Sequence, residues 1–93
     1  MRRWADVKKE IQSISETKKF ELETAASLVD EVKKIREDLG WTQRDLAEKT
    51  GLKQPAIARI ESGHTIPRLD TIAKMAKAMG YKITLSSEEN SNF

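Results

Sequence analysis

The side chains with the clearest chemical potential are an amide and a guanidinium, Gln54 and Arg59, just over one helical turn apart. If residues 54–61 form a helix, both lie on one exposed face of it, together with Pro55 and Ala58. An amide can pair with adenine through two hydrogen bonds, and a guanidinium can pair with guanine in the same way. These side chains predict a surface that contacts base edges in the major groove. The alternative is a pair of solvated helix residues without a ligand.

The surrounding residues predict two short helices joined by a turn, over Thr42–Gly63. Thr42 and Asp45 have the types and spacing of a capping box at the start of the first helix. Gly51 can take the left-handed conformation that ends this helix. Pro55 suits the first turn of the second helix, where its missing N–H costs nothing. This layout is that of a DNA-binding helix-turn-helix. Its core-facing side chains are expected to be Leu46, Ala47, Leu52, Ile57 and Ile60.

Apolar spacing predicts two further helices, one from about residue 24 to Gly40 and one from about Leu69 to Met79. Tyr81–Ser86 alternates apolar and polar residues, which predicts a strand. An isolated strand is not stable, and the chain offers no second candidate. The simplest partner is the same segment of a second copy, with Tyr81, Ile83 and Leu85 at the dimer contact. A tail with accidental alternation is the alternative.

Several stretches resemble the lambda-repressor/Cro-like (XRE) helix-turn-helix family. They are Ile35–Gln43, the stretch Thr42–Gly63 described above, Gly63–Pro67 and Leu69–Gly80, and the resemblance covers roughly residues 24–80. It implies an all-α, lambda-repressor-like bundle as the DNA-binding domain (24–80). An N-terminal helical extension (1–23) and the C-terminal strand and polar tail (81–93) flank this domain. The sequence of residues Lys53–Glu61, together with the extension and the strand, looks most like that of HigA-type antitoxins of type II toxin–antitoxin systems.

The resemblance and the side-chain chemistry together predict the DNA contacts. Gln43 matches the family glutamine that contacts the DNA backbone from the N-terminus of its helix, where free N–H groups favour a phosphate. Lys53 precedes the second helix, where a small hydroxyl residue often stands, so we expect a weaker cap and a phosphate contact. The predicted set is Gln43, Arg44, Lys53, Gln54, Pro55, Arg59, Ser62 and His64. The family pattern also implies a salt bridge between Arg36 and Glu61.

The N-terminal extension carries an amphipathic pattern. Trp4, Val7, Ile11 and Ile14 are spaced three, four and three residues apart, as on one face of a helix. Such a face must either cover its own domain or dock on another protein. The resemblance to HigA implies that the partner is a small RelE/HigB-like ribonuclease toxin. The predicted toxin-binding residues are Trp4, Val7, Lys8, Ile11 and Ile14, and packing on the chain's own domain is the alternative.

Composition narrows the class of protein. Ninety-three residues make one small domain, and the absence of cysteine excludes disulfides and thiolate metal sites and suits a reducing cytosol. No signal peptide or membrane-spanning run is expected. The single histidine makes a metal site, a cofactor or acid–base catalysis hard to build. The net charge of +2 is weak for a DNA-binding protein.

We therefore predict a cytoplasmic, non-enzymatic homodimer that reads a palindromic operator, neutralises a toxin and represses its own operon. A stand-alone XRE-type repressor without a toxin is one alternative. A protein-interaction module with this fold but no DNA binding is the other.

Overall fold

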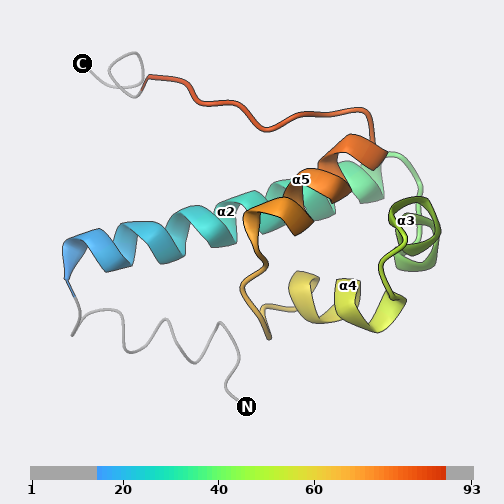
Figure 1. The fold of residues 1–93 in the computed structure, drawn as a ribbon, viewed down its shortest axis with the longest axis horizontal. Helices are drawn as coiled ribbons and strands as arrows, with labels where there is room; N and C mark the ends of the chain where they lie inside the picture. The colour runs from blue at the N-terminus through green and yellow to red at the C-terminus, as the bar shows by residue number, and fades with distance from the viewer. Residues whose placement is uncertain (1–14, 88–93) are drawn as a thin grey trace.

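The computed structural model describes residues 15–87, which form four α-helices. α2 spans Glu16–Asp38, α3 spans Gln43–Thr50, α4 spans Gln54–Glu61 and α5 spans Leu69–Ala78. α2 packs against α4 and α5, and α3 packs against the same two helices. Figure 1 shows α3, α4 and α5 gathered around the C-terminal half of α2, while the N-terminal half of α2 extends past them. The all-helical bundle predicted from the sequence is confirmed for this part of the chain.

α2 begins earlier than the apolar pattern predicted. It starts at Glu16 rather than near residue 24, because Ser15 caps it: the Ser15 hydroxyl oxygen accepts a hydrogen bond from the Lys18 backbone N–H at 3.1 Å. Leu22, on this added stretch, is buried. α2 runs continuously across position 23, and the division at that position stays a prediction.

The local signals around α3 and α4 are confirmed. The Asp45 backbone N–H donates to the Thr42 hydroxyl oxygen at 3.0 Å, and the Thr42 N–H donates to the Asp45 carboxylate at 2.8 Å. The hydrogen bond that the Asp45 carboxylate accepts from the Thr42 backbone N–H is the main cause that lowers the pKa of Asp45. Gly51 ends α3 with a φ of 79°, which an L side chain rarely adopts. Lys53 stands at the start of α4 and gives it no side-chain cap, while Pro55 lies in the first turn.

The core lies where all four helices meet. Leu46 from α3, Ile57 from α4 and Met75 from α5 are its fully buried large side chains. Full burial of each such side chain contributes about 1.5–3 kcal/mol relative to exposure. Leu52 is half-buried and packs against this cluster rather than within it. The two helices of the helix-turn-helix are thus held at a fixed angle by a shared core.

The predicted C-terminal strand is wrong for the chain as described. Residues 81–87 follow α5 without regular secondary structure, and Figure 1 shows them running back alongside α2. A strand is stable only beside a second strand that it hydrogen-bonds to, and residues 15–87 contain no second strand. Ile83 packs against the core, whereas Tyr81 is 54% exposed and Leu85 is 100% exposed. The role of these residues in dimerisation stays a prediction.

A bilayer-crossing helix needs a long, nearly uncharged apolar stretch. None of the helices between residues 15 and 87 has one.

Candidate nucleic-acid interface

α4 presents one exposed face and one buried face. Ile57 and Ile60 are buried, while Pro55 and Arg59 are exposed. Gln54, the first residue of α4, is half-buried. The predicted outward face is therefore confirmed for Pro55 and Arg59 and partly for Gln54. A short helix with its N-terminal residues at the surface has the geometry of a recognition helix that enters the major groove.

Gln54 is positioned by a second glutamine. Its side-chain N–H₂ donates to the Gln43 side-chain oxygen at 2.8 Å. Gln43 in turn donates to the Glu61 carboxylate at 3.0 Å. Only one of the two amide hydrogens of Gln54 is used in this way, so the other hydrogen and the side-chain oxygen remain for a base. A donor and an acceptor side by side match adenine in the major groove.

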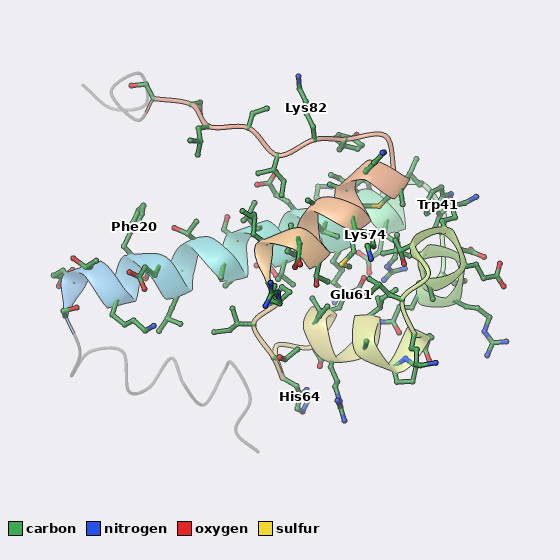
Figure 2. The ribbon with its side chains drawn as sticks, in the orientation of Figure 1. Phe20, Trp41, Glu61, His64, Lys74 and Lys82 are labelled. Atoms are coloured by element: carbon green, nitrogen blue, oxygen red, sulfur yellow. The ribbon has the colours of Figure 1, made fainter. Side chains whose placement is uncertain are left out.

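The series of hydrogen bonds from Gln54 through Gln43 ends at Glu61, which a buried ion pair with Arg36 holds in place. The Arg36 Nε lies 2.7 Å from Glu61 Oε2, and Arg36 Nη2 lies 2.9 Å from Glu61 Oε1. Arg36 Nη1 also donates to the Trp41 backbone carbonyl at 2.6 Å. The hydrogen bond to Glu61 is the main reason that the pKa of Arg36 is raised. This confirms the Arg36–Glu61 salt bridge implied by the family resemblance, and it ties α2 to the end of α4, where Figure 2 places Glu61.

The loop after α4 carries two more of the predicted contacts, Ser62 and His64. The Ser62 hydroxyl donates to the Arg59 carbonyl at 3.2 Å, and its oxygen lies 2.6 Å from Nδ1 of His64. The short contact fixes the His64 ring beside Ser62 at the end of α4. In Figure 2 the His64 side chain extends from the loop on the same side of the molecule as α4.

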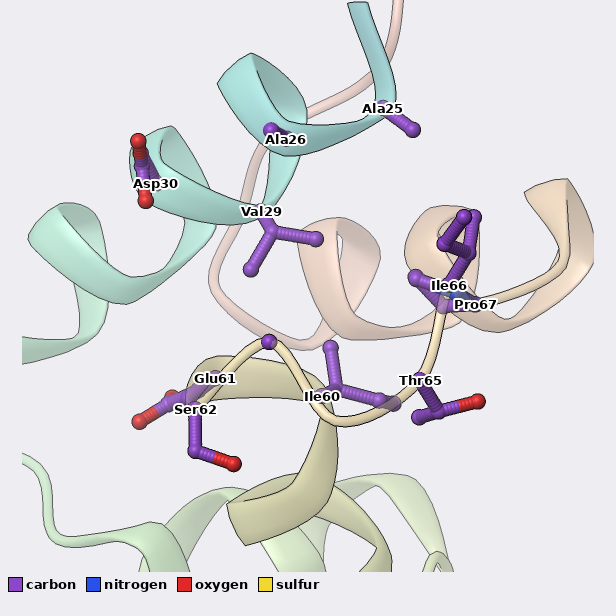
Figure 3. A pocket seen from close by; sticks show the side chains of 11 residues that line it. Ala25, Ala26, Val29, Asp30, Ile60, Glu61, Ser62, Thr65, Ile66 and Pro67 are labelled. Atoms are coloured by element: carbon purple, nitrogen blue, oxygen red, sulfur yellow. The ribbon is translucent and has the colours of Figure 1, made fainter. Parts of the chain in front are cut away.

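A small cavity of about 230 Å³ lies where this loop meets α2. In Figure 3, Ala25 and Val29 of α2 face Ile66 and Pro67 of the loop across it. The cavity adjoins the C-terminal end of α4, so it is separate from Gln54 at the other end.

Residues 32–85 match a family model described as helix-turn-helix. The chain belongs to this family. An HTH-type transcriptional regulator of Haemophilus influenzae is 34% identical over 82 residues, which cover 88% of this chain and 82% of that protein. Antitoxin HipB of Escherichia coli K12 is 32% identical over 65 residues, covering 70% of this chain and 74% of the antitoxin.

The helix-turn-helix fold also matches a solved structure along most of its length. A toxin–antitoxin module from Streptococcus pneumoniae superposes with a TM-score of 0.62 at 31% identity, covering 94% of this chain and 93% of that one. The predicted XRE-type family is thus confirmed, and the chain is a DNA-binding regulator of the helix-turn-helix class with relatives among antitoxins.

Within this helix-turn-helix protein, the structure brings some predicted contacts together and not others. Gln43 and Gln54 touch, and Ser62 and His64 touch. Arg44 and Lys53 are exposed, each at the start of its helix. The five predicted toxin-binding residues, Trp4, Val7, Lys8, Ile11 and Ile14, lie outside the described residues.

One cationic side chain was missed by the sequence interpretation. Arg68 borders the same surface hollow as Arg59, next to the loop after α4. It is largely exposed and pairs with the exposed Asp70 at 3.2 Å. That contact lowers the pKa of Asp70. A basic residue directly before α5 was the only signal available, and the sequence did not show that the loop would bring it beside Arg59.

Proposed function

We propose that this protein is the antitoxin of a type II toxin–antitoxin module, which binds a toxin and represses its own operon through α4. The observation that carries the proposal is the likeness to the Streptococcus pneumoniae toxin–antitoxin module over nearly the whole of both chains. The likeness to antitoxin HipB supports the same reading. Such a protein acts where the DNA is, in the cytoplasm.

In this proposal Gln54 reads an adenine, with its amide oriented by Gln43. Arg59 reaches a guanine or a phosphate, and the exposed ring of Pro55 contacts a thymine methyl group. The remaining predicted residues, Arg44, Lys53, Ser62 and His64, contact phosphates and fix the register of α4 on the duplex. So few base contacts in one copy favour a dimer on a palindrome, with half-sites about 34 Å apart. The exposed Tyr81 and Leu85 supply the dimer contact, supported by Ile83.

The proposed toxin is a small RelE/HigB-like ribonuclease. Trp4, Val7, Ile11 and Ile14 offer it an apolar stripe, and Lys8 borders that stripe. An aromatic side chain such as Trp4 commonly anchors an interface. The support for this finer identity is the resemblance of the chain to HigA-type antitoxins.

A gel shift with the promoter region of the chain's own operon tests DNA reading. Gln54→Ala removes one bidentate base contact, so we expect about 1–3 kcal/mol of lost binding, or about 5- to 150-fold in Kd. Thr17→Ala, at an exposed neutral residue in the first turn of α2, is the control. No shift by the parent protein at low salt, where phosphate contacts are strongest, contradicts the repressor proposal.

Purification of the tagged protein from its native host tests the toxin. We expect a small basic protein to co-purify and to be lost on deletion of residues 1–14. The likeness to the Haemophilus influenzae regulator favours a second candidate, a stand-alone repressor. A protein that shifts its operator but purifies alone supports that second function.

A further inference from the structure

An apolar groove lies between the N-terminal half of α2 and the start of α5. It encloses about 330 Å³, and its walls are Phe20, Thr24, Ala25 and Leu28 on one side and Leu69 and Ile72 on the other. We name it the α2–α5 groove. Phe20 is 59% exposed and Leu69 is 67% exposed, and Figure 2 shows Phe20 standing clear of the helix.

Phe20 and Leu69 thus place two large exposed apolar side chains beside one groove, and an apolar surface of this kind is a candidate binding site. Figure 1 shows that the N-terminal half of α2 has no other helix of the described chain beyond α5 to cover it. The groove therefore has the shape and chemistry to receive a further amphipathic helix.

We propose that residues 3–11 of the same chain pack as a helix in the α2–α5 groove. Trp4, Val7 and Ile11 form the single apolar stripe that such a helix needs, and Ile14 follows in the connection to α2. Because this stripe and the groove are both apolar, one contact removes both from water.

The length of the connection fits this placement. α2 starts at Glu16, and an antiparallel helix pair is joined by about two to five residues. Residues 12–15 supply such a turn. At about 1.5 Å of rise per residue, residues 3–11 cover about 12 Å. The stretch of α2 from Phe20 to Leu28 covers the same length. An antiparallel register with Val7 level with Phe20 sets Trp4 level with Glu23, next to Thr24.

The charges of the two segments are complementary. Residues 1–14 carry four basic and two acidic side chains, whereas residues 16–31 carry five acidic and two basic ones. On a helix, Arg3 and Lys8 border the apolar stripe. Glu21 lines the groove, and the exposed Glu23 lies close to it in sequence. A basic segment is therefore favoured over an acidic one at this site.

A consequence for regulation rests on the proposed function. A toxin that needs the same apolar stripe must first displace it from the groove, so its apparent affinity falls by the fraction of chains in which the stripe is free. The groove itself is tested without toxin, so the outcome is independent of whether the chain is an antitoxin.

The test uses the fluorescence of Trp4 in the full-length protein. The chain has two tryptophans, so Trp41→Phe leaves Trp4 as the only reporter. We expect its emission at a shorter wavelength than in the urea-unfolded protein, independent of protein concentration. Leu69→Lys places a cation and removes an apolar wall in the groove, and we expect it to abolish the whole of that shift. Leu39→Lys, at the 46%-exposed residue that ends α2, is the matched control and leaves the shift unchanged.

Three results overturn the proposal. Emission of Trp4 at the unfolded wavelength shows that the stripe is not packed. A shift that survives Leu69→Lys shows that it packs elsewhere. A shift that disappears on dilution shows that the groove is filled by a second copy. Far-UV circular dichroism checks that the Leu69→Lys variant keeps its helices. If that variant loses its helices, Phe20→Lys is tested in its place.

Discussion

Removal of the Glu61 carboxylate gives the sharpest test of how this fold holds its recognition helix. The Glu61 side chain is 2% exposed and receives two hydrogen bonds from Arg36 and one from Gln43. The Arg36 side chain is 9% exposed, so Glu61→Ala leaves its guanidinium largely buried. It keeps its hydrogen bond to the Trp41 carbonyl, and its other carboxylate neighbour, Glu37, is 3.9 Å away. A buried charge then lacks its main partner.

The magnitude follows from that burial. Removing one partner of a buried ion pair lowers the free energy of unfolding by about 3–5 kcal/mol. The total free energy of unfolding of a small domain is about 5–15 kcal/mol. We therefore expect Glu61→Ala to lose much of the free energy of unfolding. The chain supplies its own control, because Arg68 and Asp70 form an exposed pair at 3.2 Å. Exposed pairs contribute about 0–1 kcal/mol, so Asp70→Ala should have little effect.

Urea denaturation followed by circular dichroism measures both variants. A loss for Glu61→Ala no larger than that for Asp70→Ala refutes the reasoning. The double variant Arg36→Met/Glu61→Leu removes both charges and keeps the volume apolar. We expect it to recover most of the loss, because neither charge is then left buried alone.

Three further predictions concern the ends of α3 and α4. Lys53→Ser should raise the free energy of unfolding by about 0.5–2 kcal/mol, since serine supplies the side-chain cap that α4 lacks. Urea denaturation measures the change, with Lys53→Ala as the control. Equal effects of the two substitutions contradict the prediction. Gly51→Ala should lower the free energy of unfolding by about 1–2 kcal/mol, because its φ of 79° is strained for any residue with a side chain. The added methyl group meets no other atom, so the strain is the whole effect. An unchanged denaturation midpoint contradicts this prediction. The lowered pKa of Asp45 adds stability above the ordinary aspartate pKa of about 3.9, which is lost as pH falls through the lower folded value. The deficit of Asp45→Ala should therefore shrink between pH 7 and pH 2, and a constant deficit counts against the assignment.

The parts of the fold that were predictable from the sequence are those set by local chemistry. Thr42 and Asp45 cap a helix wherever they stand three apart at its start, and Gly51 needs only its own freedom of φ. The early start of α2 was not visible, because residues 16–23 are mostly polar and Ser15 alone marks the cap. The strand failed for a different reason, since alternation indicates a strand but does not supply its neighbour.

In the candidate site, too, the features set by local periodicity were predictable from the sequence, and those set by tertiary packing were not. That Pro55 and Arg59 face outward follows from helix periodicity, and the structure confirms it. The contact between Gln43 and Gln54 depends on how two helices cross, which no periodicity encodes. The proximity of Arg68 to Arg59 depends on the path of the loop between them.

The hydrogen bonds from Gln54 through Gln43 to Glu61 bear on how this protein can change its operator during evolution. A new base preference requires a different side chain at Gln54, and most replacements leave the Gln43 oxygen without its donor. Gln43 cannot turn freely to compensate, because its own amide is held by a carboxylate that the buried Arg36 also needs. Changes of specificity should therefore arrive as paired substitutions at positions 43 and 54, while 36 and 61 stay fixed. Among descendants of this chain, operators should diverge in steps rather than gradually.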